Sequence, residues 1–99
     1  MILYEWDEEK RHANLQKHRL DFLDAGELME SPDALRFRAR SVNGELRLGA
    51  IGEVDGEVLH LVYTMRENRV RCISFRKAKR KERKRYYASL QQRRAEENA

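Results

Sequence analysis

The segment from residue 35 to residue 75 constrains the fold most, because it reads as four short strands separated by turns. In its first run, apolar residues alternate with arginines as far as Arg40. The dipeptides Asn43-Gly44 and Asp55-Gly56 favour tight hairpin turns, and residues 66–69 turn the chain a third time. Strands joined by such short connections pair antiparallel, so the sequence predicts a four-stranded antiparallel meander.

Helical patterns flank the predicted sheet on both sides. Asp7 is suited to cap a helix over residues 8–18, and Asp21 to cap a second helix that ends before Ser31-Pro32. Residues from about 80 to 95 are rich in helix formers and predict a third helix. A chain of 99 residues has the size of one domain. We therefore expect a single α+β domain over residues 1–99, with two N-terminal helices, the meander and one C-terminal helix.

Charge is distributed unevenly along the chain. Residues 1–57 hold 13 acidic and 8 basic side chains, whereas residues 69–94 hold 12 basic side chains and one acidic one. The basic run, residues 76–85, is the densest part, because eight of its ten residues are cations. Such one-sided charge favours a polyanionic partner, since a surface that serves only solubility usually mixes both signs.

Several kinds of site lack their usual residues in this sequence. Cys72 is the single cysteine, so neither a disulfide nor a thiolate metal site is expected. The three histidines are scattered, and a glycine-rich phosphate loop is absent. No apolar stretch approaches the roughly 20 residues that span a bilayer, and the N-terminus is acidic. We expect a soluble cytoplasmic protein that uses neither a metal ion nor another cofactor.

The order and spacing of short motifs resemble the BrnT family of type II toxins. The residues that carry the resemblance are Glu5-Trp6-Asp7, Lys10, Asn14, Lys17-His18, Phe22, Glu45, Arg47, Gly52, Val62-Tyr63-Thr64, Arg71-Cys72-Ile73-Ser74, Arg76-Lys77-Ala78, Glu82-Arg83 and Tyr86. The resemblance implies a RelE-like fold and a growth-arresting ribonuclease that is neutralised by a BrnA-like antitoxin. It also implies a hetero-oligomer with that antitoxin or a toxin dimer, and contact with DNA only through the antitoxin. Lys79 stands where the family places Thr or Ser, and an ammonium cannot accept a capping hydrogen bond.

Arginines are the strongest candidates for the chemistry of such a ribonuclease. The 2′-hydroxyl of RNA is its own nucleophile, so the protein must mainly align it and neutralise the charge that grows on the phosphate. The guanidinium fork binds phosphate oxygens in pairs and stays charged at any working pH. We expect Arg47, Arg71 and Arg76 to meet beside the start of the last helix. In a regular strand, however, Arg71 and Arg76 would point to opposite faces, and the sequence does not determine the register of the strands.

The resemblance adds three further candidates for catalysis. It implies Glu45 as a proton acceptor, and Lys10 or His18 as proton donors or phosphate contacts. Each candidate also has an ordinary structural alternative: the arginines as surface residues, Glu45 as the partner of a nearby cation, and His18 as a favourable charge at a helix C-terminus. His60 reads as a packed core histidine.

The basic run predicts a helix that turns only one side toward the sheet. Ala78, Glu82, Tyr86 and Leu90 follow helical spacing, and cations cover the remaining circumference. The candidate RNA contacts are Lys77, Lys79, Arg80, Arg83 and Tyr86. A solvated helix face is the plain alternative. Two other functions also fit these residues, namely a non-catalytic nucleic-acid-binding module and an inactive scaffold that acts through its complex with an antitoxin.

Overall fold

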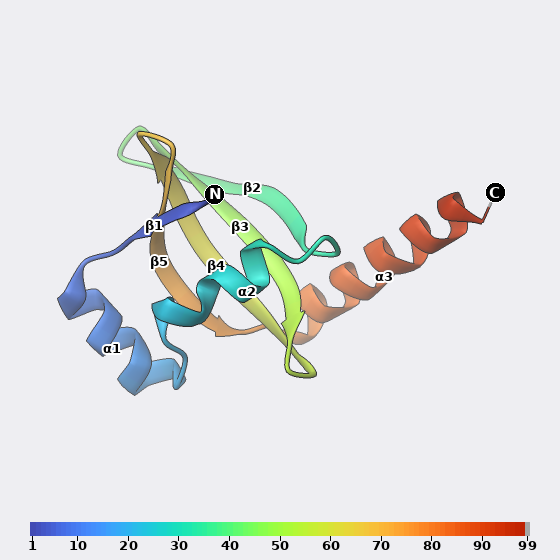
Figure 1. Ribbon diagram of the computed structural model, residues 1–99, viewed down its shortest axis with the longest axis horizontal. Coiled ribbons are helices and arrows are strands. Elements are labelled where there is room, and N and C mark those ends of the chain that lie inside the picture. The colour runs from blue at the N-terminus through green and yellow to red at the C-terminus, as the bar shows by residue number, and fades with distance from the viewer. Residues whose placement is uncertain (99) are drawn as a thin grey trace.

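Five strands form one sheet in the computed structural model, which describes residues 1–98 (Figure 1). Along the chain the elements are β1 (Leu3–Glu5), α1 (Glu8–His18), the 3-10 helix η1 (Phe22–Asp24), α2 (Ala25–Met29), β2 (Leu35–Val42), β3 (Glu45–Val54), β4 (Glu57–Arg66), β5 (Arg69–Lys77) and α3 (Arg80–Glu97). The strand order is β1-β5-β4-β3-β2. The predicted α+β class and the antiparallel meander of β2 to β5 are confirmed.

The prediction of a four-stranded, purely antiparallel sheet is wrong, because β1 adds a fifth strand. This strand pairs parallel with the start of β5, with Leu3 opposite Arg69 and Glu5 opposite Arg71. Three residues are too few to show an alternating pattern, so periodicity does not reveal the strand in the sequence. The sheet is therefore mixed, and β1 covers the first part of β5.

Aspartates begin the N-terminal helical segments where the sequence predicts. Asp7 accepts hydrogen bonds from the backbone amides of the first turn of α1. Asp21 caps the next segment, but that segment is η1 followed by α2 instead of one continuous helix. Phe22, Ala25 and Leu28 are all buried. Phe22 lies in η1, and Ala25 and Leu28 lie in α2; a 3-10 turn commonly begins an α-helix, and here it lets all three side chains reach the same core.

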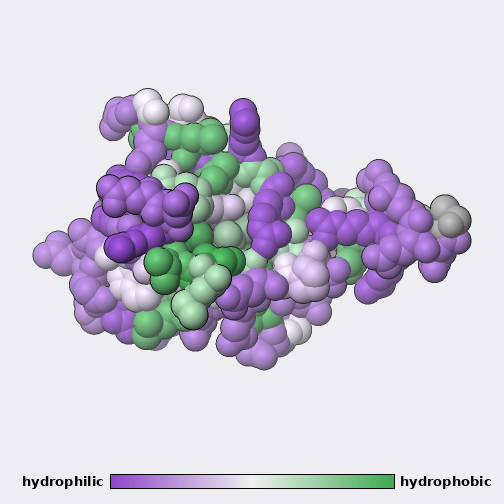
Figure 2. All heavy atoms as spheres, turned by 45° about the horizontal axis from the view of Figure 1, so that its top comes forward, coloured by the Kyte–Doolittle hydropathy of each residue, from purple (hydrophilic) through white to green (hydrophobic). Residues whose placement is uncertain are grey.

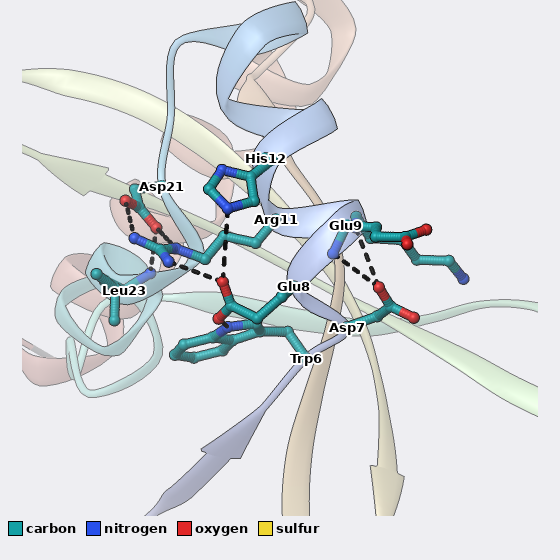
Figure 3. Close-up of polar contacts among 9 residues, drawn as sticks. Trp6, Asp7, Glu8, Glu9, Arg11, His12, Asp21 and Leu23 are labelled. Carbon is teal, nitrogen blue, oxygen red and sulfur yellow. Dashed lines mark hydrogen bonds and ion pairs between the residues drawn. The ribbon is translucent and has the colours of Figure 1, made fainter.

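A polar network fixes α1 to the segment that follows it (Figure 3). Arg11 binds both carboxylate oxygens of Asp21, at 2.8 and 3.1 Å, and also Glu8 at 3.0 Å. Glu8 in turn accepts a hydrogen bond from the indole of Trp6 at 2.8 Å. These contacts orient α1, which carries two of the candidate catalytic residues.

Asn14 joins α1 to the outer edge of β5. Its side-chain amide donates to the carbonyl of Phe75 at 2.9 Å and accepts from the Phe75 amide at 3.0 Å. The side chain thereby makes the hydrogen bonds that a neighbouring strand would make. β1 and Asn14 both cover the outer edge of β5, while β2 forms the opposite edge of the sheet.

The two faces of the sheet are covered in different ways. On one face, here called the covered face, η1 and α2 bury a core that includes Phe22, Leu28, Leu61 and Phe75. On the other face, the first half of α3 packs through Tyr86 against a smaller cluster on β3 and β4. The part of this second face that α3 leaves uncovered is called the open face below.

α3 extends well beyond the sheet (Figure 1). Tyr86 and Leu90 pack toward the sheet, as helical spacing predicts, and Ala78 packs there too although it precedes the helix. Only one half of a capping box forms at the helix start, because Glu82 accepts from the Lys79 backbone amide at 2.7 Å but the ammonium cannot reciprocate. The protruding end of the helix is almost entirely hydrophilic in Figure 2. Among residues 1–98, no helix has the length and apolar character needed to cross a membrane.

Candidate functional site

A β-bulge in β5 decides which arginines share a face of the sheet. The pairing of β4 with β5 skips Ile73, which is an extra residue on β5. An extra residue reverses the alternation of the side chains beyond it. Arg71 and Arg76 therefore lie on the same face despite their different parity. Their partners on β4 are Thr64 and His60, whose side chains both lie on the open face.

A second bulge has the same effect on β2. The pairing of β2 with β3 skips Ala39, so Arg40 moves to the open face and lies directly opposite Arg47. Regular alternation in the sequence predicts that Arg40 lies on the same face as Arg38. This prediction is wrong, because the bulge at Ala39 reverses the alternation beyond it. Arg47 itself lies on the face opposite its apolar neighbour Leu48, which packs in the core of the covered face, as strand alternation requires.

One hollow on the open face, here called the central hollow, collects these cations. Its volume is about 520 Å³, which lies within the range of about 300–1,000 Å³ that is usual for ligand pockets. Its lining residues are Ala39, Arg40, Val42, Arg47, Val62, Ile73, Arg76 and Lys79. Four of the eight are cationic and none is acidic, so the central hollow suits an anion.

Two smaller hollows adjoin the central hollow through shared lining residues. The Glu45 hollow, of about 70 Å³, shares Arg47 and Ile73 with it and also includes Lys10 and Arg71. The helix hollow, of about 230 Å³, shares Ile73 and is lined by α1. The fold thus brings the six predicted catalytic residues into three adjoining hollows: Lys10, His18, Glu45, Arg47, Arg71 and Arg76.

Two of the three predicted arginines are held by carboxylates. Arg71 pairs with Glu5 of β1 at 2.6 Å. Arg76 makes a two-point ion pair with Glu82 of α3, at 2.8 and 2.9 Å. These pairs fix the direction of each guanidinium and also reduce the charge that it offers to a further anion.

His60 and Glu82 form, together with Arg76, a polar cluster that the sequence analysis missed. His60 is buried, as predicted, and its Nδ1 lies 2.8 Å from Glu82 and 3.0 Å from Arg76. The hydrogen bonds from Arg76 lower the pKa of Glu82 to about 2. Burial lowers the pKa of His60 in spite of the neighbouring carboxylate. The signal available in the sequence was that Glu82 is the single acid of the basic run.

Arg47 is the least neutralised of the three arginines. Among residues 1–98, the one carboxylate within 4 Å is Glu45, at 3.9 Å, and Glu45 accepts instead from Arg66 at 3.0 Å. The Nε of Arg47 is buried without a hydrogen-bond partner. A buried donor without a partner is costly, and so is the like charge of Arg40 directly across the strand pair. An anion bound in the central hollow would offset both costs.

The proton-transfer candidates differ in their electrostatic surroundings. Burial, Lys17 and Arg76 lower the pKa of His18, so its imidazole is neutral at neutral pH and can accept a proton. The hydrogen bond from Arg66 lowers the pKa of Glu45, which makes that carboxylate a weaker base. His18 is therefore the better suited acceptor of the two.

The cations predicted to contact RNA lie in unequal surroundings. Lys79 lines the central hollow, and Arg80 is exposed on the first turn of α3. Lys77 lies 3.6 Å from the carboxylate of Glu57. Arg83 donates to a backbone carbonyl at the start of α3, at 2.7 Å. Lys79 and Arg80 are thus the better placed of the four for a chain that enters the central hollow.

Tyr86 does not offer its ring to RNA, and the prediction for this residue is wrong. It is only 3 % exposed, because the helical spacing that turns Leu90 toward the sheet turns Tyr86 there as well. Its neighbour Tyr87 is 47 % exposed and meets the Tyr86 ring edge-on. Tyr87 is therefore the accessible aromatic ring of this helix turn.

The side chains that could bind a metal ion are dispersed over residues 1–98. Within residues 1–98, no three His, Cys, Asp or Glu side chains are grouped so that they could hold a metal ion. Cys72 is buried, and burial raises the pKa of its thiol to about 12. The open face thus combines fixed cations with the neutral imidazole of His18, an arrangement that can stabilise charge on a phosphate and accept a proton.

Comparison with known proteins gives one family match. A family model described as "Ribonuclease toxin, BrnT, of type II toxin-antitoxin system" matches residues 6–82. This range includes every residue that lines the central hollow. No curated protein matches the chain.

Proposed function

The chain belongs to the BrnT family of ribonuclease toxins of type II toxin-antitoxin systems, and we propose that it is a metal-independent endoribonuclease of the mRNA interferase type. A backbone phosphate of the RNA binds in the central hollow, and the adjacent 2′-hydroxyl attacks it. The protein acts in the cytoplasm, where cleavage arrests growth. A BrnA-like antitoxin forms a hetero-oligomer with it and covers the open face, which blocks entry of RNA.

The observation that carries this proposal is the pair of arginines that face each other across β2 and β3. Arg40 and Arg47 are opposite one another in a hollow whose lining contains no carboxylate. Like charges in this position destabilise a strand pair unless an anion lies between them. Guanidinium groups bind phosphate oxygens in pairs, so an RNA phosphate is an anion of the right chemistry.

The reaction needs two proton transfers and stabilisation of one charged intermediate. The 2′-oxygen bonds to phosphorus, the bond from phosphorus to the 5′-oxygen breaks, and the products are a 2′,3′-cyclic phosphate and a 5′-hydroxyl. In this proposal the neutral imidazole of His18 takes the proton of the 2′-hydroxyl, with Glu45 as the alternative acceptor. Lys10, which lines both smaller hollows, gives a proton to the leaving 5′-oxygen.

The arginines divide the work according to their partners. Arg47 and Arg40 contact the phosphate and stabilise its growing charge, because neither is neutralised by a close carboxylate. Arg71 and Arg76, held by Glu5 and Glu82, contribute fixed N–H groups at the rim. Lys79 and Arg80 guide the neighbouring phosphates.

Cleavage of a long RNA by the purified chain in EDTA tests the proposal. We expect Arg47→Ala to lower the cleavage rate by about 10²-fold or more, as for loss of one donor to a developing oxyanion. Arg38→Ala is the matched control, since Arg38 is an exposed β2 arginine that lines none of the three hollows. Undiminished cleavage by a folded Arg47→Ala variant would remove the central hollow from the active site.

The same assay separates the catalytic function from a binding function. The exposed cations of α3 favour a non-catalytic nucleic-acid-binding module as the second candidate, and this module would give a salt-sensitive gel shift with intact RNA. For the enzyme, the rate should rise with pH up to the lowered pKa of His18 and then level off. His18→Gln should abolish this rise.

A further inference from the structure

The two edges of the sheet are treated differently by the rest of the chain. The outer edge of β5 is covered by β1 and by the side chain of Asn14. β2 is the other edge strand, and it has a strand neighbour on one side only, which is β3. Most of its residues are exposed. One long edge of the sheet is therefore open to solvent.

The open edge carries backbone groups that could bind another strand. In an antiparallel pair, every second residue of an edge strand points its N–H and C=O outward. Within residues 1–98, no hydrogen bond beyond the ladder with β3 involves a backbone atom of β2. The bulge at Ala39 divides the edge, and the regular run before it is Leu35–Arg38.

The charge of β2 restricts what can bind at this edge. Its eight residues include three arginines and no acid. A second copy of the chain would place arginines beside arginines, so pairing of β2 with itself is disfavoured. Phosphates of RNA could accept from outward N–H groups but offer nothing to the outward carbonyls. An extended peptide with carboxylates satisfies both the backbone and the charge.

The alternation of β2 specifies the pattern of that peptide. Arg36 and Arg38 are exposed on the covered-face side of the strand. Arg36 donates one hydrogen bond to the backbone carbonyl of Met29, and neither arginine has a carboxylate partner among the described residues. Leu35 and Phe37 lie on the other side and are half-buried against α3. A neighbouring strand therefore gains most from carboxylates at every second position and apolar residues between them.

We infer that β2 is a docking edge for an extended segment of the antitoxin, in which acidic and apolar residues alternate. The segment adds a sixth strand next to Leu35–Arg38, with its carboxylates beside Arg36 and Arg38. The central hollow is lined by three residues farther along the same strand, namely Ala39, Arg40 and Val42. The part of the antitoxin that continues beyond its docked strand therefore lies at the mouth of that hollow. The identity of the partner rests on the proposed function, whereas the docking edge does not.

Hydrogen exchange of the full chain tests the docking edge directly. The probe is a blocked nonapeptide of alternating Glu and Val, and the control peptide has Lys in place of Glu. We expect the Glu-Val peptide to slow exchange of outward amides in residues 35–38 by about tenfold or more, and the Lys-Val peptide to leave them unchanged. Arg38→Glu should remove protection by the first peptide and create protection by the second.

The variants keep this inference separate from the proposed function. Arg38→Glu should cleave RNA like wild type, whereas Arg47→Ala should lose cleavage and keep protection by the Glu-Val peptide. If the wild-type chain cleaves no RNA but its 35–38 amides are protected by the Glu-Val peptide, the docking edge is supported and the proposed ribonuclease activity is refuted. Unchanged exchange of the 35–38 amides in wild type at saturating Glu-Val peptide would overturn the inference. So would protection of these amides by an RNA oligonucleotide, because the edge would then be an RNA surface.

Discussion

The ion pair between Arg76 and Glu82 makes a quantitative prediction about stability. Glu82 accepts hydrogen bonds from both Nη atoms of Arg76 and from the backbone amide of Lys79, and it lies 2.8 Å from His60. We consider Glu82→Gln, which keeps the shape of the side chain and one acceptor oxygen but removes the charge. The variant should be less stable than wild type at neutral pH, because Arg76 loses its charged partner.

The size of the effect follows from the pKa of Glu82. A fall from the ordinary value of 4.5 to about 2 corresponds to about 3 kcal/mol in the free energy of unfolding, since one pKa unit is about 1.4 kcal/mol. The Glu82 side chain is 21 % exposed, so water weakens the pair and we expect about 2 kcal/mol. The lowered pKa means that this stabilisation is complete above pH 4.5 and is lost as the pH falls toward 2.

Urea denaturation of both proteins between pH 7 and pH 3 measures the effect. The difference in unfolding free energy should be about 2 kcal/mol at pH 7 and should fall to about half or less at pH 3, because the Glu82 carboxyl is then protonated in the unfolded chain and must release its proton on folding. Glu96→Gln, an exposed carboxylate farther along α3, is the control and should change stability by less than about 0.5 kcal/mol. An equal difference at pH 7 and pH 3 would refute the electrostatic explanation and point to packing instead.

Two further predictions concern buried groups on α1 and β5. Asn14→Ala should lower the free energy of unfolding by about 2–4 kcal/mol, because the amide and carbonyl of Phe75 lose their buried partner; a loss under about 0.5 kcal/mol in urea denaturation would contradict the role of Asn14 at the edge of β5. Cys72 should resist alkylation by iodoacetamide in the native protein at pH 8, because its thiol is buried with a pKa of about 12. It should react readily in denaturant, and rapid labelling of the native protein would contradict the burial.

Several features that position the candidate site could be predicted from the sequence, because they depend on interactions between residues close together in the chain. Asp7 and Asp21 cap the segments that they were expected to cap. Two hairpin turns fall at the Asn43-Gly44 and Asp55-Gly56 dipeptides, as predicted. Arg47 points away from the apolar face because strand alternation requires it. The roles of Glu82 and His60 were not accessible, because a carboxylate and an imidazole that are 22 residues apart meet only through packing of α3 on the sheet.

The sequence by itself determined the aspartate helix caps and the hairpin turns, which residues are cationic, and that the chain resembles a family of ribonuclease toxins. Caps, turns and periodicity act over a few residues and can be read locally. Only the tertiary structure decided which cations share a face. One extra residue in β5 and one in β2 bring Arg71, Arg76 and Arg40 onto the face of Arg47. Bulges of this kind depend on the pairing of each strand with its neighbour, and pairing is a property of the assembled sheet.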